Sequence, residues 1–254
     1  MKQIIIDHPP ILGTLVFLLL WATSLLTARY IRGTALRNAE AKEDFGVLTA
    51  AVLTLLGLII GFTFSMAISR YDQRKGFEEA EANAIGTEYA RADLLPRDDA
   101  TAVRSLLRQY TQERIRYYEP LTRDQVEQSA VTRSRLQREL WSAIIPAASV
   151  QPTAMTALVV SGMNDVLNSE GYTNAAWLNR IPLEAWALLL LIALVASVMI
   201  VSSAPTLQKR SPLLLILPAV VAVSLTMIAD IDSPRGGLIL VGAPNLQAVL
   251  GQMH

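Results

Sequence analysis

The acidic residues that could support chemistry are concentrated between positions 78 and 93. They are Glu78, Glu79, Glu81, Glu88 and Asp93. Basic residues stand three or four positions from several of them, at the spacings that allow side chains to pair along a helix: Arg74–Glu78, Lys75–Glu79 and Glu88–Arg91. The pattern favours a water-exposed helix face with paired charges. The alternative is a cation site or an ion-conducting vestibule that the same carboxylates form in several subunits.

A second acidic pair, Asp230 and Asp232, directly follows an apolar stretch. A helix end at a membrane surface, followed by a turn at Ser233-Pro234, accounts for it. In the alternative interpretation, one of these carboxylates pairs with Arg70 or Arg74 and ties the tail to the helix that carries them.

Other sequence signatures of catalysis are missing. The two histidines, His8 and His254, stand at opposite ends of the chain, and cysteine is absent. Gly236-Gly237 is an isolated pair rather than a phosphate-binding loop, and no Gly-x-Ser-x-Gly elbow is present. The apolar stretches contain no ionisable group beyond Glu184 near one end, which argues against a membrane-embedded enzyme or a proton-coupled transporter. We therefore expect a protein that is not an enzyme, with no catalytic residue, metal site or cofactor.

Composition indicates a membrane protein with a water-exposed part. Of 254 residues 52% are hydrophobic, and the mean hydropathy is +0.36. The formal net charge is zero, with 22 basic and 22 acidic residues, so no global field would attract nucleic acid. The expected surroundings are a lipid bilayer, and nucleic acid is not an expected partner.

Four apolar stretches have the length and composition of membrane spans, which need roughly 20 residues: 10–28, 45–69, 183–204 and 212–229. Pro218 is expected to kink the last of them. We predict an all-α integral membrane protein with four transmembrane helices and a helical soluble domain inserted between the second and third spans. The predicted divisions are a first membrane pair, an extramembrane domain, a second membrane pair and a tail: 1–69, 70–181, 182–230 and 231–254.

The inserted region shows helical spacing of apolar residues, punctuated by Pro and Asp. The second span is expected to continue as a helix to about Leu95. Three further helices are expected at about 98–118, 123–145 and 152–169. The tail is expected to pack on this domain or on a neighbouring subunit.

Within the second span, small residues recur every four positions: Gly57, Gly61, Ser65 and Ser69. Such a stripe allows another helix backbone to approach closely, because helices associate in lipid through packing. The alternative is that the stripe faces a pore in an oligomer, where Thr63, Ser65 and Ser69 would offer hydroxyls.

The stretch from Gly61 to Pro96 resembles the bestrophin-like proteins of bacteria and plants, and the span arrangement fits that family. The matching pieces are Arg70-Tyr71-Asp72-x-Arg74, Glu81-Ala-x-Ala-Ile-Gly-Thr87, Arg91-x-Asp93-Leu-Leu-Pro96 and Asp232-Ser-Pro-x-x-Gly237. The resemblance marks Arg70, Tyr71, Asp72, Arg74, Glu81, Arg91, Asp93 and Asp232 as coupling and motif residues.

True bestrophin anion channels are similar in a looser way. In that family the second span lines a pentameric pore and leaves the membrane through a Tyr-Asp-Arg-Trp-Trp-like segment. Here Gln73-Arg74-Lys75 replace the residues that include the tryptophan pair. The resemblance implies a homo-oligomer, a pentamer by analogy, that passes small ions through an apolar neck. The pore and neck candidates are Ile60, Phe62, Phe64 and Ser65, although lipid-facing or core positions are the alternative for the three apolar residues.

The orientation in the membrane stays open. Six basic residues flank the spans on each side, which gives a tie under the positive-inside rule. The first span alone favours the soluble domain outside the cell, whereas the family resemblance implies a cytosolic domain. The function expected is an oligomeric bestrophin-like channel in the cell (inner) membrane. The alternative is a non-conducting membrane scaffold or sensor whose soluble helices bind a partner protein.

Overall fold

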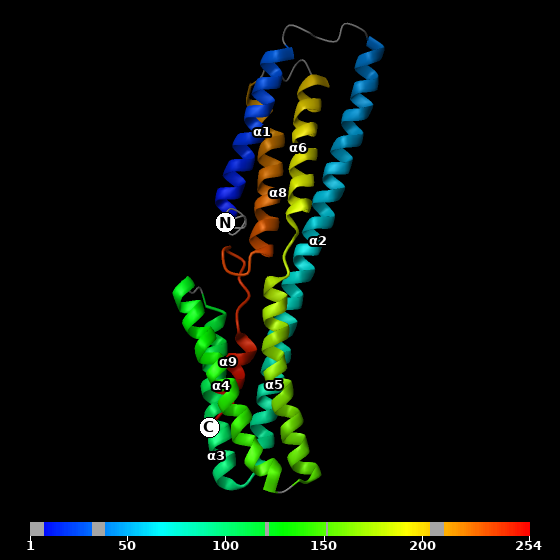
Figure 1. The fold of residues 1–254 in the computed structure, drawn as a ribbon. Helices are drawn as coiled ribbons and strands as arrows, with labels where there is room; N and C mark the ends of the chain where they lie inside the picture. The colour runs from blue at the N-terminus through cyan, green and yellow to red at the C-terminus, as the bar shows by residue number, and fades with distance from the viewer. Residues whose placement is uncertain (1–7, 32–38, 120–121, 151, 204–210) are drawn as a thin grey trace. The chain divides into compact units, whose positions relative to one another are not determined.

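The computed structural model describes residues 8–31, 39–119, 122–150, 152–203 and 211–254. The short loop 205–210 and much of the loop 29–44 lie outside these ranges. The described chain is helical and contains no strand. Its elements are α1 Pro9–Ile31, α2 Ala39–Arg91, a 3-10 turn Ala92–Leu94, α3 Arg97–Tyr117, α4 Arg123–Val150, α5 Ala154–Leu178, α6 Leu183–Ser203, a 3-10 turn Ser211–Leu215, α8 Ile216–Asp232 and α9 Pro244–Gln252 (Figure 1).

Four stretches of the described chain are long and apolar enough to cross a membrane: Pro9–Tyr30, Phe45–Leu94, Ala154–Ser203 and Pro212–Asp232. Three of them contain a predicted span in full, and Ala154–Ser203 contains the described part of the span 183–204. The all-α membrane fold is therefore as expected. The helices α2 and α5 extend these stretches beyond the length that a bilayer requires.

The chain divides into two compact units. The membrane unit comprises Met1–Arg70 and Arg180–Leu240, and the helical unit comprises Tyr71–Asn179 and Val241–His254. The stretch 231–254, predicted as a tail, falls across this division. Residues 231–240 belong to the membrane unit, and residues 241–254 belong to the helical unit.

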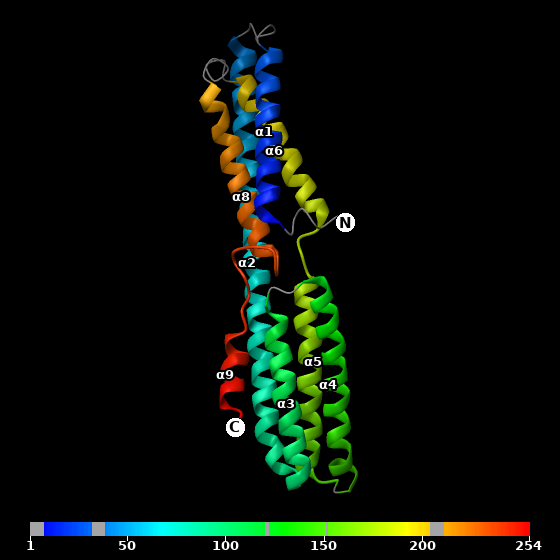
Figure 2. The ribbon, with the colours of Figure 1, turned by 90° about the vertical axis from the view of Figure 1, so that its left-hand side faces the viewer.

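In the membrane unit, α1 packs along α6 and α8 (Figures 1 and 2). Gly13 on α1 allows the closest approach, because a Cβ there would overlap Thr226 Oγ1 on α8. Pro218 does not interrupt α8. It stands in the first turn of α8, where a backbone N–H has no partner within the helix. The proline therefore lies at the start of the helix and does not produce the expected kink.

The helical unit is built from the second part of α2 together with α3, α4, α5 and α9 (Figure 2). Its core contains Val103, Leu107 and Tyr110 of α3, Leu140 of α4 and Met163 of α5, all of them fully buried or nearly so. The helix α4 continues through Pro146 to Val150, beyond the expected end at 145. The helix α5 begins with a Thr153–Thr156 capping box. It ends at Leu178, nine residues beyond the predicted end at 169.

The helix α2 is continuous over 53 residues, and it is the only α-helix of the described chain that contributes to both units. The division between the units falls at Arg70 and Tyr71. Because no proline interrupts the stretch, every backbone N–H beyond the first turn can bond within the helix.

Candidate functional site on the second span and its exit

The membrane part of α2 buries one narrow side in the membrane unit. Leu56, Thr63 and Ala67 are buried and lie within one quarter-turn of each other around the helix. Only 11% of the most apolar window of this span is buried, against 39% for the last span. The described residues of the chain therefore leave most of the surface of the second span uncovered.

The small-residue stripe lies on the uncovered side of α2. Gly57, Gly61, Ser65 and Ser69 are exposed, and a Cβ added at either glycine would meet no atom within 4 Å. The described residues of the subunit therefore place nothing against the two glycines. If the stripe serves packing, the partner at Gly57 and Gly61 is not among the residues that the structure describes.

The neck candidates fall on two sides of the helix. Ile60 and Phe64 are half-buried and lie one turn apart, whereas Phe62 is 64% exposed. At about 100° per residue, Phe62 points roughly 160° away from Phe64. These two rings cannot both point along one radius into a central pore. Ser65, the fourth candidate, is exposed within the stripe.

Asp232 occupies a buried junction at the exits of the spans. Its side chain is 1% exposed and lies 3.6 Å from Nη1 of Arg70. Arg180 Nε donates to it at 3.4 Å, and the backbone N–H of Ile181 lies 3.2 Å from both carboxylate oxygens. The Arg70 alternative for this carboxylate is thus present in the structure. The junction joins the interior of α2, at Arg70, and the end of α8 to the segment that enters α6.

Asp230 organises the loop that follows α8. Its two oxygens accept hydrogen bonds from the N–H groups of Leu238 at 2.7 Å and Ile239 at 2.9 Å. Gly237 must lack a side chain for this loop to close, because a Cβ would lie 2.7 Å from Asp230 Cγ and 2.8 Å from its carbonyl oxygen. Ser233 Oγ accepts from the N–H of Gly236 at 3.0 Å. Both carboxylates of the pair are therefore committed to structural contacts.

Beyond the exit, Tyr71 is half-buried against the core of the helical unit, and Asp72 is exposed. Arg74 is fully buried and donates at 3.3 Å to the carbonyl oxygens of Ala176 and Asn179. These carbonyls belong to the last turn and C-cap of α5, where a cation is favoured by the helix dipole. Arg74 therefore secures the end of α5 to α2.

The expected water-exposed acidic face is wrong for three of its five members. Glu78, Glu81 and Glu88 are essentially fully buried, while Glu79 is exposed. Asp93 is also exposed and pairs with Arg104. The buried acids lie on the side of α2 that faces α3, α5 and α9, where spacing along α2 does not determine their partners.

Glu81 is the partner of Arg114 in a buried ionic network. Arg114, on α3, binds Glu81 through Nε and through Nη2 at 2.9 Å, and its side chain is fully buried. Thr173 donates a further hydrogen bond to Glu81 at 3.0 Å. Arg114 Nη1 lies 3.4 Å from Glu170 on α5, and Arg133 on α4 binds the same carboxylate at 2.8 Å. Two arginines thus neutralise two glutamates inside the helical unit.

The network changes the acidity of its members. Burial by itself would raise the pKa of Glu170, but Arg114 and Arg133 lower it below the ordinary value. Burial raises the pKa of Tyr110 well above its ordinary value, and the nearby Glu170 raises it further. The Tyr110 hydroxyl therefore stays protonated and donates to Glu170 at 2.9 Å.

Glu78 holds the tail. It accepts hydrogen bonds from Leu246 N at 2.9 Å and from Asn245 Nδ2 at 2.6 Å, within the first turn of α9. A carboxylate at that place is favoured by the unpaired N–H groups and the dipole of a helix start. Tyr89 donates to the carbonyl oxygen of His254 at 2.6 Å. The tail residues 241–254 are thereby fixed to α2.

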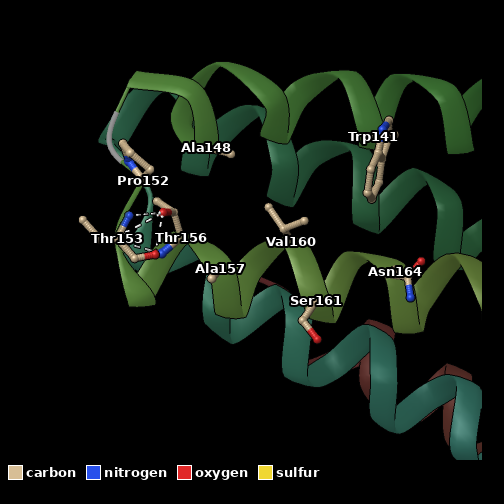
Figure 3. A pocket seen from close by; sticks show the side chains of 9 residues that line it. All are labelled: Trp141, Ala148, Pro152, Thr153, Thr156, Ala157, Val160, Ser161 and Asn164. Atoms are coloured by element: carbon tan, nitrogen blue, oxygen red, sulfur yellow. Dashed lines mark hydrogen bonds between the residues drawn. The ribbon is translucent and has the colours of Figure 1, made fainter.

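A groove of about 670 Å³ opens between α4 and α5 (Figure 3). Trp141 projects from α4 toward α5, and Val160 projects from α5 toward α4. The Thr153–Thr156 cap forms one end of the groove, and the lining is mostly apolar. No group of three or more His, Cys, Asp or Glu side chains placed to hold a metal ion occurs in the described part of the chain.

Comparison with known protein families identifies the fold. Residues 15–243 match the bestrophin-like domain. The chain belongs to the bestrophin-like family. A bacterial bestrophin homolog from Klebsiella pneumoniae superposes with a TM-score of 0.63 at 13% identity, over 94% of this chain and 95% of that one. A mutant of that homolog gives 0.64 at 14% identity, over 95% and 97%. A further crystal structure, described as a membrane protein, gives 0.62 at 14% identity over 95% of both chains. No curated protein matches the chain.

In this bestrophin-like protein the sequence motifs have separate structural roles. Asp232 and Gly237 build the junction and the loop after α8, and Glu81 belongs to the ionic network. Arg91 donates to the carbonyl oxygen of Leu158 at 3.4 Å. Arg70, from the first motif, contacts the Asp232 carboxylate within the membrane unit.

Sequence reasoning missed Arg114, Arg133, Glu170 and Tyr110. A usable signal was present for Arg114, which stands four positions after Tyr110 and seven after Leu107 on the apolar side of α3. A charged residue on the core side of an amphipathic helix requires a buried partner. No such pattern marks which glutamate supplies it.

Proposed function

We propose that this bestrophin-like protein is an oligomeric channel that passes small ions through a pore lined by α2. The observation that supports the proposal most is the low burial of the second span in the subunit, 11% of its most apolar window. A helix that carries an uncovered stripe of small residues is suited to close packing against another copy. Four spans in one subunit do not enclose a pore, so a closed ring of several copies is required.

The two sides of α2 then take different tasks. Ile60 and Phe64, one turn apart, face the pore and form an apolar neck that gates by dewetting. The stripe of Gly57, Gly61, Ser65 and Ser69 packs against a neighbouring subunit. Phe62 lies outside the neck, since it points roughly 160° away from Phe64. The Asp232 junction holds α2, α6 and α8 together at the exits of the spans.

We place the protein in the cell membrane and assign it neither a cofactor nor catalysis. The family match over residues 15–243 supports the membrane location. Arg70, Tyr71, Asp72 and Arg74 form the segment of α2 where the two units divide. Because α2 continues through that segment without a break, changes in the helical unit can reach the neck along one helix.

A non-conducting scaffold is the second candidate, and the groove between α4 and α5 favours it. The groove is open and mostly apolar, and Trp141 at its wall is 39% exposed. Exposed aromatic side chains beside an apolar groove are typical of partner-binding surfaces. In this candidate function an apolar segment of a partner protein occupies the groove.

The two candidates differ in subunit number. The mass of the purified full chain in detergent or in lipid nanodiscs should correspond to a closed ring of several copies if the protein is a channel. A stable monomer that retains its helical content would contradict the channel and favour the scaffold. Gly61→Leu provides the matched variant, because a large side chain on the stripe should dissociate the ring without disturbing any contact at Gly61 within the subunit. Glu79→Gln, on the exposed side of the same helix beyond the span, should leave the ring intact.

A further inference from the structure

The carboxyl group of Glu88 is buried without a hydrogen bond. Its side chain is fully buried, and neither oxygen has a hydrogen-bond partner among the described residues. Glu78 and Glu81 on the same helix are equally buried but accept two or more hydrogen bonds each. An ionised carboxylate without such bonds is costly to bury, and a group in that position becomes neutral instead.

Two charged groups act on Glu88, one from each helix that contributes to the site. Arg91 on α2 places Nη1 4.0 Å from Oε2, at the limit of an ion pair, and the same nitrogen donates to Leu158 O at 3.4 Å. Asp165 on α5 contributes a like charge that opposes ionisation. Burial raises the pKa of Glu88, the nearby Arg91 lowers it by a smaller amount, and the like charge of Asp165 raises it. Together these effects give a pKa of about 8. Arg91 is therefore too far from Glu88, and already hydrogen-bonded to Leu158, to stabilise the ionised Glu88 carboxylate.

The space that the carboxyl fills depends on a glycine of α5. A Cβ on Gly162 would overlap both Glu88 Oε2 and Arg91 Nη1, and it would lie 3.1 Å from Glu88 Cδ. The α2 side chain therefore packs directly on the α5 backbone. Beside this contact lies a polar cavity of about 270 Å³, whose lining includes Asn83, Thr87, Arg91, Gly162 and Asp165. Arg91 and Gly162 belong both to the cavity lining and to the contact with Glu88, so the cavity adjoins the buried carboxyl.

We propose that Glu88 is a proton-binding site that controls how tightly α2 packs on α5. The protonated side chain fits against Gly162 as a compact neutral group. When the proton leaves, the new charge is drawn toward Arg91 and the polar cavity, and the contact with α5 loosens. The proposal concerns the helical unit and does not depend on ion conduction.

The direction of the pH effect follows from the raised pKa. The folded protein keeps a proton that the unfolded chain releases near the ordinary value of 4.5. Stability contributed by Glu88 is therefore complete below that value, falls as the pH rises, and is lost by about pH 8. Above this pH Glu88 contributes no further change.

The test is urea unfolding of the full chain in detergent between about pH 5 and about pH 10, followed by the fluorescence of Trp177 in the core of the helical unit. In wild type the unfolding midpoint should fall with rising pH and level off above about pH 8. Glu88→Gln, a neutral mimic of the protonated acid, should remove that part of the slope. Glu79→Gln changes an exposed acid on the same helix and should keep the slope of the wild type. A Glu88→Gln protein with the full wild-type slope would overturn the proposal.

A measurement on the wild type guards against a variant that fails to fold. Infrared difference spectra of the folded protein should show the carbonyl stretch of a protonated carboxylic acid at about pH 6 and its loss by about pH 10. A spectrum without that band at about pH 6 would overturn the proposal. Gly162→Ala should shift the disappearance of the band to lower pH, because the added Cβ displaces the carboxyl from its buried place.

Discussion

Replacing Arg114 by methionine removes one charge from the centre of the helical unit. Arg114 contacts Glu81 through two nitrogens, lies 3.4 Å from Glu170 and places its guanidinium 4.8 Å from the ring centre of Tyr117. The substitution leaves Glu81 buried without its cation. Breaking a buried pair from one side costs about 3–5 kcal/mol, so we expect a loss of that size in the stability of the helical unit.

A surface pair in the same unit supplies the control. Arg135 lies 2.8 Å from Glu139 one turn along α4, and the Arg135 side chain is 54% exposed. Removing this pair by Arg135→Met should cost about 0.3–0.5 kcal/mol, because water screens it. The double variant Glu81→Met/Arg114→Met should recover much of the loss of the single variant, since no unpaired charge of this pair remains buried.

The assay is urea unfolding of the full chain in detergent, with Trp177 fluorescence reporting the helical unit. Trp177 lies 4.9 Å from Tyr117, between ring centres, beside the network. Substitution of Trp21, Trp141 and Trp186 by phenylalanine isolates this signal. Equal losses for Arg114→Met and Arg135→Met would refute the conclusion that burial makes the Arg114 pair important. A double variant as unstable as the single variant would refute the same conclusion.

Three further variants test other contacts. Gly237→Ala should destabilise the loop after α8 by about 2–4 kcal/mol, through loss of charge-assisted hydrogen bonds to Asp230; faster proteolysis of residues 233–240 would report it. Gly13→Ala should cost about 1–3 kcal/mol of membrane-unit stability through overlap with Thr226, and removing the Thr226 hydroxyl should restore part of it in thermal melts. Glu170 ionises at a lower pH in the folded protein than in the unfolded chain, so the stability it contributes is complete above about pH 4.5 and is lost as the pH falls below that value. Glu170→Gln should therefore remove this part of the acid-induced loss of stability. Acid unfolding identical to that of the wild type would contradict this.

The span pattern and the inserted helices could be predicted because both depend on local sequence. Apolar length determines the spans, and the apolar spacing around Val103 and Leu107 determines α3. Pro146 and Pro218 were misleading for a physical reason. Proline costs little in a first turn such as that of Pro218, and tertiary packing can carry a helix through a proline such as Pro146.

Burial of the acids on α2 could not be predicted from spacing. The same i,i+3 and i,i+4 pattern arises on a solvated face and on a face that meets other helices. The partner of Glu81 stands 33 positions away, and Glu170 and Arg133 are 37 positions apart. A single sequence does not show which residues so far apart along the chain will pair in the fold. The tail was divided for a similar reason, since Asp230 and Glu78 take its two parts into different units.

Planar-bilayer recording of the purified ring tests whether α2 lines an ion-conducting pore with Phe64 in its neck. The recording compares wild type with Phe64→Ala and with Phe62→Ala, the matched control on the other side of the helix. We expect a larger current for Phe64→Ala, because a smaller side chain widens the neck and eases its wetting. For Phe62→Ala we expect a current close to that of the wild type. A correctly assembled ring without current in all three proteins, or a larger current for Phe62→Ala alone, would contradict the proposed pore.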